Sequence, residues 1–146
     1  MSQYILDTDH VTLSQHGNSK ILQRAQAVGS SNIFITTVTL EEQLKGRLAS
    51  ISKCATKSEL LAVAYRNLRI TQIYFCSMNL LDFDDAAYSY YQSLRQQKIQ
   101  IGTQDLRIAA IALVNEAILV TRNHRDFSKV PNLCLEDWTM DGYKNT

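Results

Sequence analysis

The chain has 146 residues, of which 45% are hydrophobic and 20% charged, and its formal net charge is +1. These values are typical of a soluble globular protein, and we expect residues 1–146 to form a single domain. No apolar run approaches the roughly 20 residues that cross a bilayer, and no secretion signal opens the chain, so we expect a cytoplasmic protein without membrane contact. The three cysteines are too far apart for a disulfide framework or a paired zinc site.

The first half of the chain alternates short apolar strands with helices. Strands are indicated by β-branched and apolar runs, and helices by apolar residues that recur every three or four positions. The last helix of this half carries Thr56 and Glu59 in the spacing of a capping box. The expected elements are a strand over 3–6, a helical segment over 10–15, a helix over 19–28, a strand over 32–38, a helix bearing Leu40, Leu44, Leu48 and Ile51, and a helix from about Thr56 to Ile73.

The second half repeats this alternation. Its most apolar helix is entered through Gly102 and Thr103. The expected elements are a short apolar segment over 79–83, a helix capped by Asp84 that bears Ala87, Tyr91 and Leu94, a helix over 104–114, and strands over 117–121 and 132–138. Short apolar strands that alternate with helices predict an α/β fold with a parallel sheet covered on both faces.

Four carboxylates stand where such a fold presents side chains at the carboxyl ends of strands or in the first turns of helices: Asp7, Glu42, Asp105 and Asp126. Carboxylates that are gathered in one place repel one another and lose hydration, and a divalent cation offsets both costs. The sequence therefore predicts a site for Mg²⁺ or Mn²⁺ built from these four residues. The implied reaction is hydrolysis of a phosphate ester by metal-activated water.

Some of these side chains have simpler interpretations. Glu42 and Asp105 are also placed to stabilise a helix through its dipole. Asp9 is either a further ligand or the cap of the helical segment that follows it. Glu41 is expected to face solvent, one residue away from the helix face that carries Glu42. For Asp7 the metal role is favoured, because core packing does not require a charge directly after an apolar strand.

Histidine and basic residues give weaker signals. His10, His16 and His124 show no zinc-ligand spacing and no nucleophile motif, so we expect roles at the surface or in support of a neighbouring side chain. Within residues 43–81, six basic residues stand against a single acid, Glu59. This stretch either contacts phosphates or forms the solvated faces of two helices. The basic residues are Lys45, Arg47, Lys53, Lys57, Arg66 and Arg69.

At these residues the chain resembles the PIN-domain ribonucleases, specifically the VapC-type toxins of bacterial toxin–antitoxin pairs. The resemblance rests on six segments in the same order: YILDTDHVTL, ITTVTLEEQLKG, FDDAAYSYYQSLRQQ, IGTQDLRIAAIAL, LVTRNHRDF and VPNLCLEDW. It implies a three-layer α/β/α sandwich with a short, mainly parallel sheet. It also implies an endoribonuclease that depends on Mg²⁺ or Mn²⁺, forms a homodimer, and is inhibited by a small antitoxin.

The resemblance assigns roles to individual residues. Asp7, Glu42 and Asp105 fall on the acidic positions of the family and would hold the principal metal ion. Asp9 stands where these toxins commonly have Asn, and the fourth acidic position falls on either Asn123 or Asp126. Gln43 replaces a usual Leu, so the register depends mainly on Gly46 and leaves Glu41 as the alternative ligand. Asp9, Thr121 and Asn123 would orient ligands or the scissile phosphate, and the candidates for RNA contact are Lys45, Arg47, Arg107 and Arg122.

Two other functions fit parts of the sequence. The segment ILDTDHV also resembles the start of a haloacid-dehalogenase-type phosphatase, in which Asp7 would be a covalent nucleophile and Asp9 its acid or base. The chain lacks the later lysine and paired aspartates of that family. The other alternative is a non-catalytic PIN-like module that binds RNA or a protein, but such a module predicts an incomplete acidic cluster.

Overall fold

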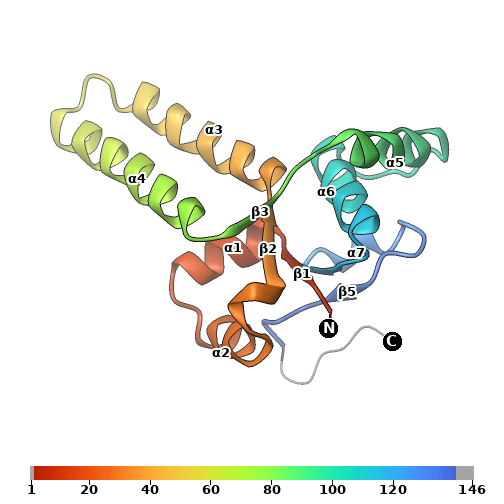
Figure 1. Cartoon of the computed structure of the whole chain (residues 1–146). Coiled ribbons are helices and arrows are strands. Elements are labelled where there is room, and N and C mark those ends of the chain that lie inside the picture. The colour runs from red at the N-terminus through yellow and green to blue at the C-terminus, as the bar shows by residue number, and fades with distance from the viewer. Residues whose placement is uncertain (1, 141–146) are drawn as a thin grey trace.

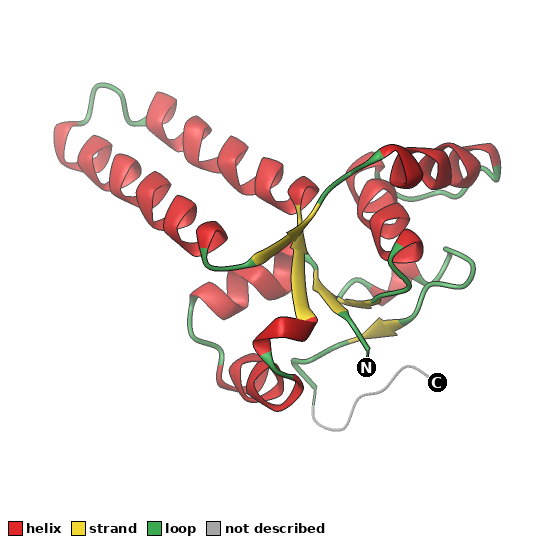
Figure 2. Ribbon diagram, in the orientation of Figure 1, coloured by secondary structure: helices red, strands yellow, loops and turns green. Residues whose placement is uncertain are grey.

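The computed structural model describes residues 2–140, and at its centre is a five-stranded sheet (Figure 2). The strands lie in the order β3-β2-β1-β4-β5, and all neighbouring pairs are parallel. The strands are β1 (Tyr4–Leu6), β2 (Ile33–Thr36), β3 (Asn79–Leu81), β4 (Ile118–Val120) and β5 (Leu135–Glu136). They are shorter than the apolar segments that predicted them. Four lie where a strand was expected, and β3 lies in the short apolar segment expected over 79–83.

Helices connect successive strands and cover the sheet (Figure 1). They are α1 (Thr8–Gln15), α2 (Ser19–Val28), α3 (Thr37–Lys53), α4 (Ser58–Cys76), α5 (Asp85–Gln96), α6 (Thr103–Val114) and α7 (His124–Phe127), with a 3₁₀ turn, η1, at Ser30–Asn32. None of the helices in the described part of the chain is long and apolar enough to cross a membrane. The predicted three-layer α/β/α arrangement is confirmed.

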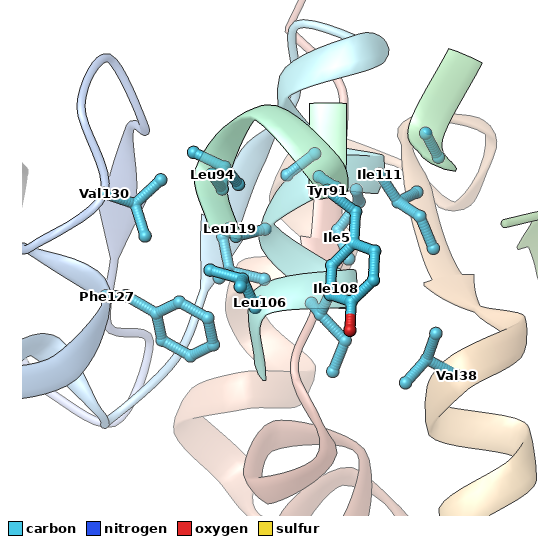
Figure 3. Close-up of a cluster of buried hydrophobic side chains, with 14 of the residues drawn as sticks. Ile5, Val38, Tyr91, Leu94, Leu106, Ile108, Ile111, Leu119, Phe127 and Val130 are labelled. Carbon is cyan, nitrogen blue, oxygen red and sulfur yellow. The ribbon is translucent and has the colours of Figure 1, made fainter. Parts of the chain in front are cut away.

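Successive strand residues pack on opposite faces of the sheet, because side chains alternate along a strand. Ile5 and Leu119 belong to one buried cluster with side chains of α5 and α6, which Figure 3 shows. Leu6 and Val120, their neighbours in the sequence, belong to a second cluster with α1 and α2. The sheet is therefore buried on both faces, and the carboxyl ends of its strands are left as the place where polar side chains can gather.

The pair α3 and α4 packs as a hairpin that extends away from the sheet (Figure 1). In α3 only Val38 and Thr39 are buried. The apolar stripe predicted for this helix lies only partly in the core: Leu40 packs against the second cluster, whereas Leu48 is 56% exposed. The hairpin thus carries apolar side chains that the rest of the described chain does not cover.

Several helix boundaries differ from those predicted. Helix α1 begins at Thr8, with Asp7 as its N-cap, so the hypothesis that Asp9 caps this helix is wrong. Helix α4 begins at Ser58, and no side chain at its N-cap makes a capping bond, so the capping box at Thr56 is also wrong. Asp84 does cap α5: its Oδ1 accepts the Ala87 amide at 2.9 Å. Cys54, Cys76 and Cys134 are free thiols.

Candidate metal centre

The site lies where the strand order reverses. From β1 the chain builds the sheet toward β2 and β3, whereas β4 and β5 are added on the other side of β1. Leu6 pairs with Val120, and the Asp7 amide donates to the Val120 carbonyl at 2.9 Å, so Asp7 and Thr121 leave the sheet side by side. At such a reversal the connections diverge and leave a crevice, which is the usual ligand position in parallel α/β sheets.

Asp7 is buried at the centre of this edge, with 6% of its surface exposed. Its Oδ1 accepts the Thr8 amide at 2.9 Å, and its Oδ2 accepts the Thr121 hydroxyl at 2.8 Å. Burial, together with the nearby charges of Asp9 and Asp105, raises the pKa of Asp7 to about 7, and the two hydrogen bonds limit the rise. Without a cation, the fold therefore leaves this carboxyl about half protonated near pH 7, where an ordinary aspartate is fully ionised.

Glu42 and Asp105 face the same edge from two helices. Glu42 lies in the second turn of α3 and Asp105 in the first turn of α6, and both are half-buried. Burial raises the pKa of each carboxyl. The charge of Asp105 adds to the rise for Glu42, and the charges of Asp126 and Asp9 add to the rise for Asp105. The structure thus places the three best-matched carboxylates of the sequence prediction at one edge, where burial and the charge of Asp105 both raise the pKa values of Asp7 and Glu42.

The fourth carboxylate lies at the margin. Asp126 is on α7, is partly exposed and pairs with Arg125 and Lys129. A hydrogen bond from Asn123 and these two cations lower its pKa, despite some desolvation. The Asn123 amide nitrogen lies 3.2 Å from Asp126 Oδ2 and 3.5 Å from Asp105 Oδ2. Both candidates for the fourth position are therefore present at one place, with Asn123 between the two aspartates.

Asp9 supports the edge instead of capping α1. Its Oδ2 accepts the Arg122 amide at 3.0 Å and lies 3.4 Å from the Thr121 hydroxyl. Burial opposes its ionisation, but hydrogen bonds from His10 and Arg122 outweigh burial and keep its pKa below the ordinary value. Asp9 is thus a charged anchor for the turn after β4.

Glu41 is exposed, as predicted. It accepts a hydrogen bond from Gln104 at 2.8 Å and pairs with Lys45 at 3.4 Å, and these two partners lower its pKa. The opposite directions of the two pKa shifts separate Glu41 from Glu42, because Gln104 and Lys45 already stabilise the charge of Glu41. The environment favours Glu42 as the ligand on α3.

The four basic candidates for RNA contact have different surroundings. Lys45 is exposed, and so is Arg122, whose backbone anchors Asp9. Arg107 donates to Gln104 at 2.8 Å and lies 5.5 Å from the centre of the Tyr91 ring. Arg47 donates to the buried Thr71 hydroxyl at 2.8 Å, inside the α3–α4 hairpin. The Arg47 side chain therefore joins α3 to α4.

The donors at the edge suit a divalent cation. They are carboxylate oxygens, the hard ligands that Mg²⁺ and Mn²⁺ prefer, and three of them have pKa values raised by burial and mutual repulsion. Ion pairs with Lys or Arg between described residues reach Glu41, Asp126 and Glu136 but not Asp7, Glu42 or Asp105. Within residues 2–140, no three metal-binding side chains are close enough to hold one ion as they stand. The carboxylates of this edge therefore fit a divalent cation in their charge and in the type of ligand atom they offer.

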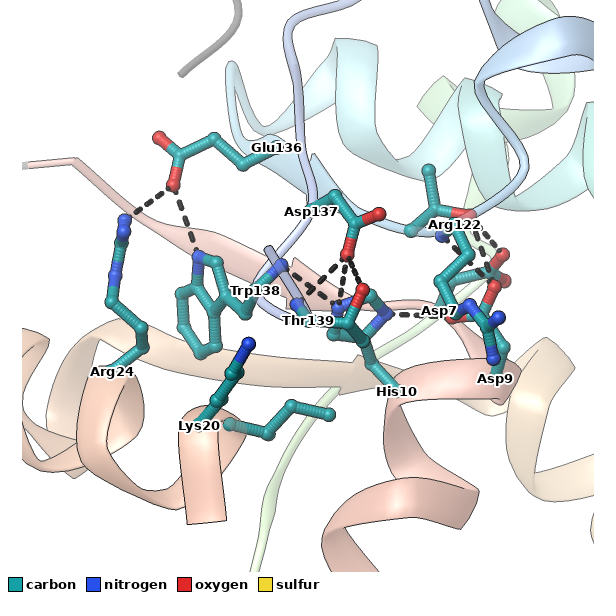
Figure 4. A network of polar contacts seen from close by, with 12 residues as sticks. Asp7, Asp9, His10, Lys20, Arg24, Arg122, Glu136, Asp137, Trp138 and Thr139 are labelled. Atoms are coloured by element: carbon teal, nitrogen blue, oxygen red, sulfur yellow. Dashed lines mark hydrogen bonds and ion pairs between the residues drawn. The ribbon is translucent and has the colours of Figure 1, made fainter. Parts of the chain in front are cut away.

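Sequence reasoning missed the surroundings of His10. The histidine side chain is fully buried and contacts Asp9 on one side and the segment after β5 on the other (Figure 4). A lone histidine without ligand spacing carries no signal of such a role. His16 is exposed, and His124 is half-buried on α7.

Fold and site together define a class: a parallel α/β protein with a carboxylate-rich centre at the reversal of strand order.

Comparison with known families extends this result. A model of the PIN domain matches residues 4–133, which is most of the chain. The chain therefore belongs to the PIN domain family. It is 30% identical to ribonuclease VapC2 of Rickettsia felis over 141 residues, which cover 92% of this chain and 97% of that protein. It is 24% identical to the tRNA(fMet)-specific endonuclease VapC of Salmonella typhimurium, with 94% and 99% covered.

Solved structures agree with these relatives. The DNA-bound VapBC of Salmonella typhimurium has the same fold, with a TM-score of 0.78 and 24% identity over 94% of this chain and 99% of that one. VapBC2 of Rickettsia felis, bound to a DNA fragment from its promoter, gives a TM-score of 0.73 and 27% identity over 92% and 98%. The predicted resemblance to VapC-type PIN proteins is confirmed, and the match gives no support to the phosphatase alternative.

Proposed function

We propose that this protein is a metal-dependent endoribonuclease that cuts RNA in the cytoplasm as the toxin of a toxin–antitoxin pair. The observation that carries the proposal is the acidic edge of Asp7, Glu42 and Asp105, three carboxylates whose pKa values are raised where the strand order reverses. Relatives that cover nearly the whole chain are named ribonucleases or endonucleases, which supports RNA as the substrate.

The three carboxylates would hold Mg²⁺ or Mn²⁺, and Asp126 or Asn123 would complete the site. When bound, such an ion supplies the water activation and charge neutralisation that phosphodiester hydrolysis requires. Neighbouring side chains of the protein would orient these carboxylates. The Thr121 hydroxyl fixes the carboxylate of Asp7, and the Asn123 amide bridges toward Asp105 and Asp126. No side chain is required as a covalent nucleophile.

Substrate binding would use the exposed cations around this edge. Arg122 follows Thr121 directly, and Lys45 lies one helical turn beyond Glu41 on α3. Positive side chains at these positions attract phosphates without reading the bases. The other basic residues of α3 and α4 are mostly exposed along the hairpin, as expected of solvated helix faces.

Protein partners are a further part of the proposal. Structures with 25 to 27% identity to this chain are VapBC complexes, which supports a small antitoxin as a partner. A homodimer is proposed from the resemblance to VapC-type toxins. The α3–α4 hairpin exposes large apolar side chains, among them Leu48, Leu60 and Ile73. Exposed apolar surface of this kind is typical of a protein interface.

The test is cleavage of total cellular RNA by the purified protein with Mg²⁺ or Mn²⁺, beside a reaction with EDTA. Asp7→Asn and Asp105→Asn remove ligand charges, whereas Asp85→Asn removes an exposed carboxylate in the first turn of α5 and is the matched control. We expect discrete fragments from the wild-type protein and from Asp85→Asn. We expect none with EDTA or with either ligand variant.

A parallel calorimetric titration with Mn²⁺ separates the possible failures. RNA that stays intact although Mn²⁺ binds would contradict a broad endoribonuclease and leave a narrow RNA target as the substrate. RNA that stays intact without Mn²⁺ binding would overturn the catalytic proposal in favour of the non-catalytic PIN-like module. Cleavage that survives EDTA and both ligand substitutions would place the activity elsewhere or in a contaminant.

A further inference from the structure

His10 joins two segments that are far apart in the chain (Figure 4). Its ring is fully buried, with Nδ1 2.7 Å from Asp9 Oδ1 and Nε2 3.1 Å from the backbone nitrogen of Trp138. The Trp138 side chain is itself buried, and its Nε1 donates to Glu136 at 3.0 Å. A buried imidazole with a partner at both nitrogens has a single orientation, so its role extends beyond filling space.

The partners of the ring fix its tautomer. A backbone N–H can only donate, so the Nε2 atom that faces Trp138 must carry a lone pair, and the ring proton must be on Nδ1. The other acid near Nε2 is Asp137, whose Oδ1 lies 3.6 Å away. That oxygen already accepts from the amide and the hydroxyl of Thr139, at 2.8 and 2.5 Å. The neutral ring therefore donates from Nδ1 to Asp9.

The bond to Asp9 continues into the acidic edge. The second oxygen of Asp9 accepts the Arg122 amide, which holds the turn that follows β4. In the same turn the Thr121 hydroxyl accepts a hydrogen bond from the backbone amide of Asn123 at 3.0 Å and donates one to Asp7. The side chain of Asn123 reaches Asp105. Hydrogen bonds, joined by the covalent backbone of residues 121–123, thus connect the Trp138 backbone to two of the carboxylates that would bind the metal.

We propose that His10 is a positioning residue for the acidic edge. As the Nδ1–H tautomer it fixes the Asp9 carboxylate, and through Asp9 it sets the turn over residues 121–123 that presents Thr121 to Asp7 and Asn123 to Asp105. The effect on cleavage rests on the proposed function, whereas the effect on the turn does not. Loss of a direct hydrogen-bond partner of a metal ligand typically lowers metal affinity or activity 10- to 100-fold, and we expect the low end of this range for His10, which acts through Asp9 and the turn.

A purely structural role is the competing explanation, because His10 also satisfies the buried amide of Trp138. Two substitutions separate the roles. In His10→Asn the side-chain amide NH₂ can take the place of Nδ1–H and donate to Asp9, but nothing reaches Trp138. In His10→Gln the longer side chain can place its oxygen near Nε2 and accept from Trp138, while the donor to Asp9 is lost. His16→Asn is the control, since His16 is exposed.

The experiment measures three quantities on each folded variant: hydrogen exchange of the Arg122 amide, Mn²⁺ affinity by calorimetry, and the rate of RNA cleavage. We expect His10→Asn and His16→Asn to stay within about threefold of the wild type in all three. We expect His10→Gln to exchange Arg122 at least tenfold faster and to lose about tenfold in Mn²⁺ affinity and in rate. In the wild type, the ¹⁵N resonances of the His10 ring should show a proton on Nδ1 and none on Nε2.

Equal effects of the two His10 substitutions on Arg122 exchange, or a larger effect of His10→Asn, would overturn the proposal in favour of the structural role. A proton on Nε2 in the wild type would also overturn it. If the wild-type protein cleaves no RNA or binds no Mn²⁺, the proposed function fails. The exchange and tautomer measurements still decide the role of His10 in that case, because neither requires metal or substrate.

Discussion

Most proteins bury apolar side chains and expose charged ones. The acidic edge of the sheet and the α3–α4 hairpin depart from this rule in opposite ways. At the edge a carboxylate, Asp7, is buried beside other carboxylates, whereas the hairpin leaves Leu48, Ile70 and Ile73 more than half exposed. Charged side chains are rarely buried unless paired, and monomeric proteins rarely expose large apolar patches. Neither feature stabilises the isolated chain.

The difference between the two regions indicates what each one lacks. Buried carboxylates that repel one another gain most from a cation, whereas exposed isoleucines and leucines gain most from another apolar surface. The edge therefore fits the metal ion of the proposed nuclease, and the hairpin fits a protein partner. If this comparison holds, substitutions at the edge should alter activity and pH dependence, and those on the hairpin should alter association.

The largest expected effect separates two neighbouring glutamates at the edge. Glu42→Gln should lower the rate of RNA cleavage by about 100-fold or more, because it removes a ligand charge from the metal site. Glu41→Gln should leave the rate within about threefold, since Glu41 is exposed and already paired with Lys45. The measurement is single-turnover cleavage with saturating Mn²⁺. A greater loss in Glu41→Gln would move the ligand assignment to that residue.

The next effect concerns stability and pH in metal-free protein. The folded pKa of Asp7 is about 7, against an ordinary 3.8. Between these values the unfolded chain has released this proton and the folded chain keeps it, so the free energy of unfolding falls as the pH rises from about 4 to 7. Asp7→Asn removes this contribution. We expect the variant to be more stable than the wild type by about 2–4 kcal/mol at pH 8 and similar to it at pH 4.

Urea denaturation in EDTA across this pH range measures the difference, with Asp85→Asn as the control that should follow the wild type. Parallel profiles for Asp7→Asn and the wild type would mean that the folded protein holds Asp7 ionised without a cation. Adding Mn²⁺ should stabilise the wild type and not the variant, because an ion that binds only the folded state raises its stability. The gain for the wild type should shrink below pH 7, where protons compete for the carboxylate.

A smaller effect is expected from the hydroxyl that holds Asp7. Thr121→Val keeps the shape of a buried side chain. It removes the hydroxyl that donates to Asp7 and accepts from the backbone amide of Asn123. Mn²⁺ affinity near pH 7 should fall about tenfold, because the carboxylate is less well oriented and harder to ionise. Thr121→Ser keeps the hydroxyl and should bind like the wild type. Equal affinities of the valine and serine variants would show that this hydroxyl is dispensable.

The smallest expected effect is on the hairpin, where two residues of α4 provide a contrast. Ile73 is 54% exposed and Phe75 is 4% exposed. In the monomer, Ile73→Ser should change the free energy of unfolding by less than about 0.5 kcal/mol, whereas Phe75→Ala should cost about 3–5 kcal/mol. Denaturation at several protein concentrations tests this. A large, concentration-dependent loss for Ile73→Ser would show that a second copy of the chain covers this face.

Much of the acidic edge was predictable because its signals are local. Asp7 follows a strand of apolar residues directly, and Asp105 stands in the first turn of an apolar helix. Parallel strands present their carboxyl ends at one edge, so the meeting of these side chains followed from the expected fold. The hypothesis that Asp9 caps α1 was wrong because the helix begins at Thr8, two residues before the expected start at residue 10.

Other features depend on contacts that no local pattern encodes. The leucines of α3 predicted an apolar face correctly, but the same stripe fits a core and a partner surface equally well. Helix α7 is only four residues long, too short to show a periodic pattern. The burial of His10 depends on Trp138, which is 128 positions away in the chain. Only the folded arrangement brings that pair together.

The order of strands also determines when the edge can form during synthesis. The ribosome releases β1 first and β4 and β5 last, yet β1 pairs directly with β4, and the segment after β5 closes over His10. The amino-terminal part of a nascent chain can begin to fold early, but it lacks Thr121, Arg122 and Trp138. A growing chain therefore carries Asp7 without the turn that orients it, and it cannot assemble the centre until nearly all of the described residues have been made.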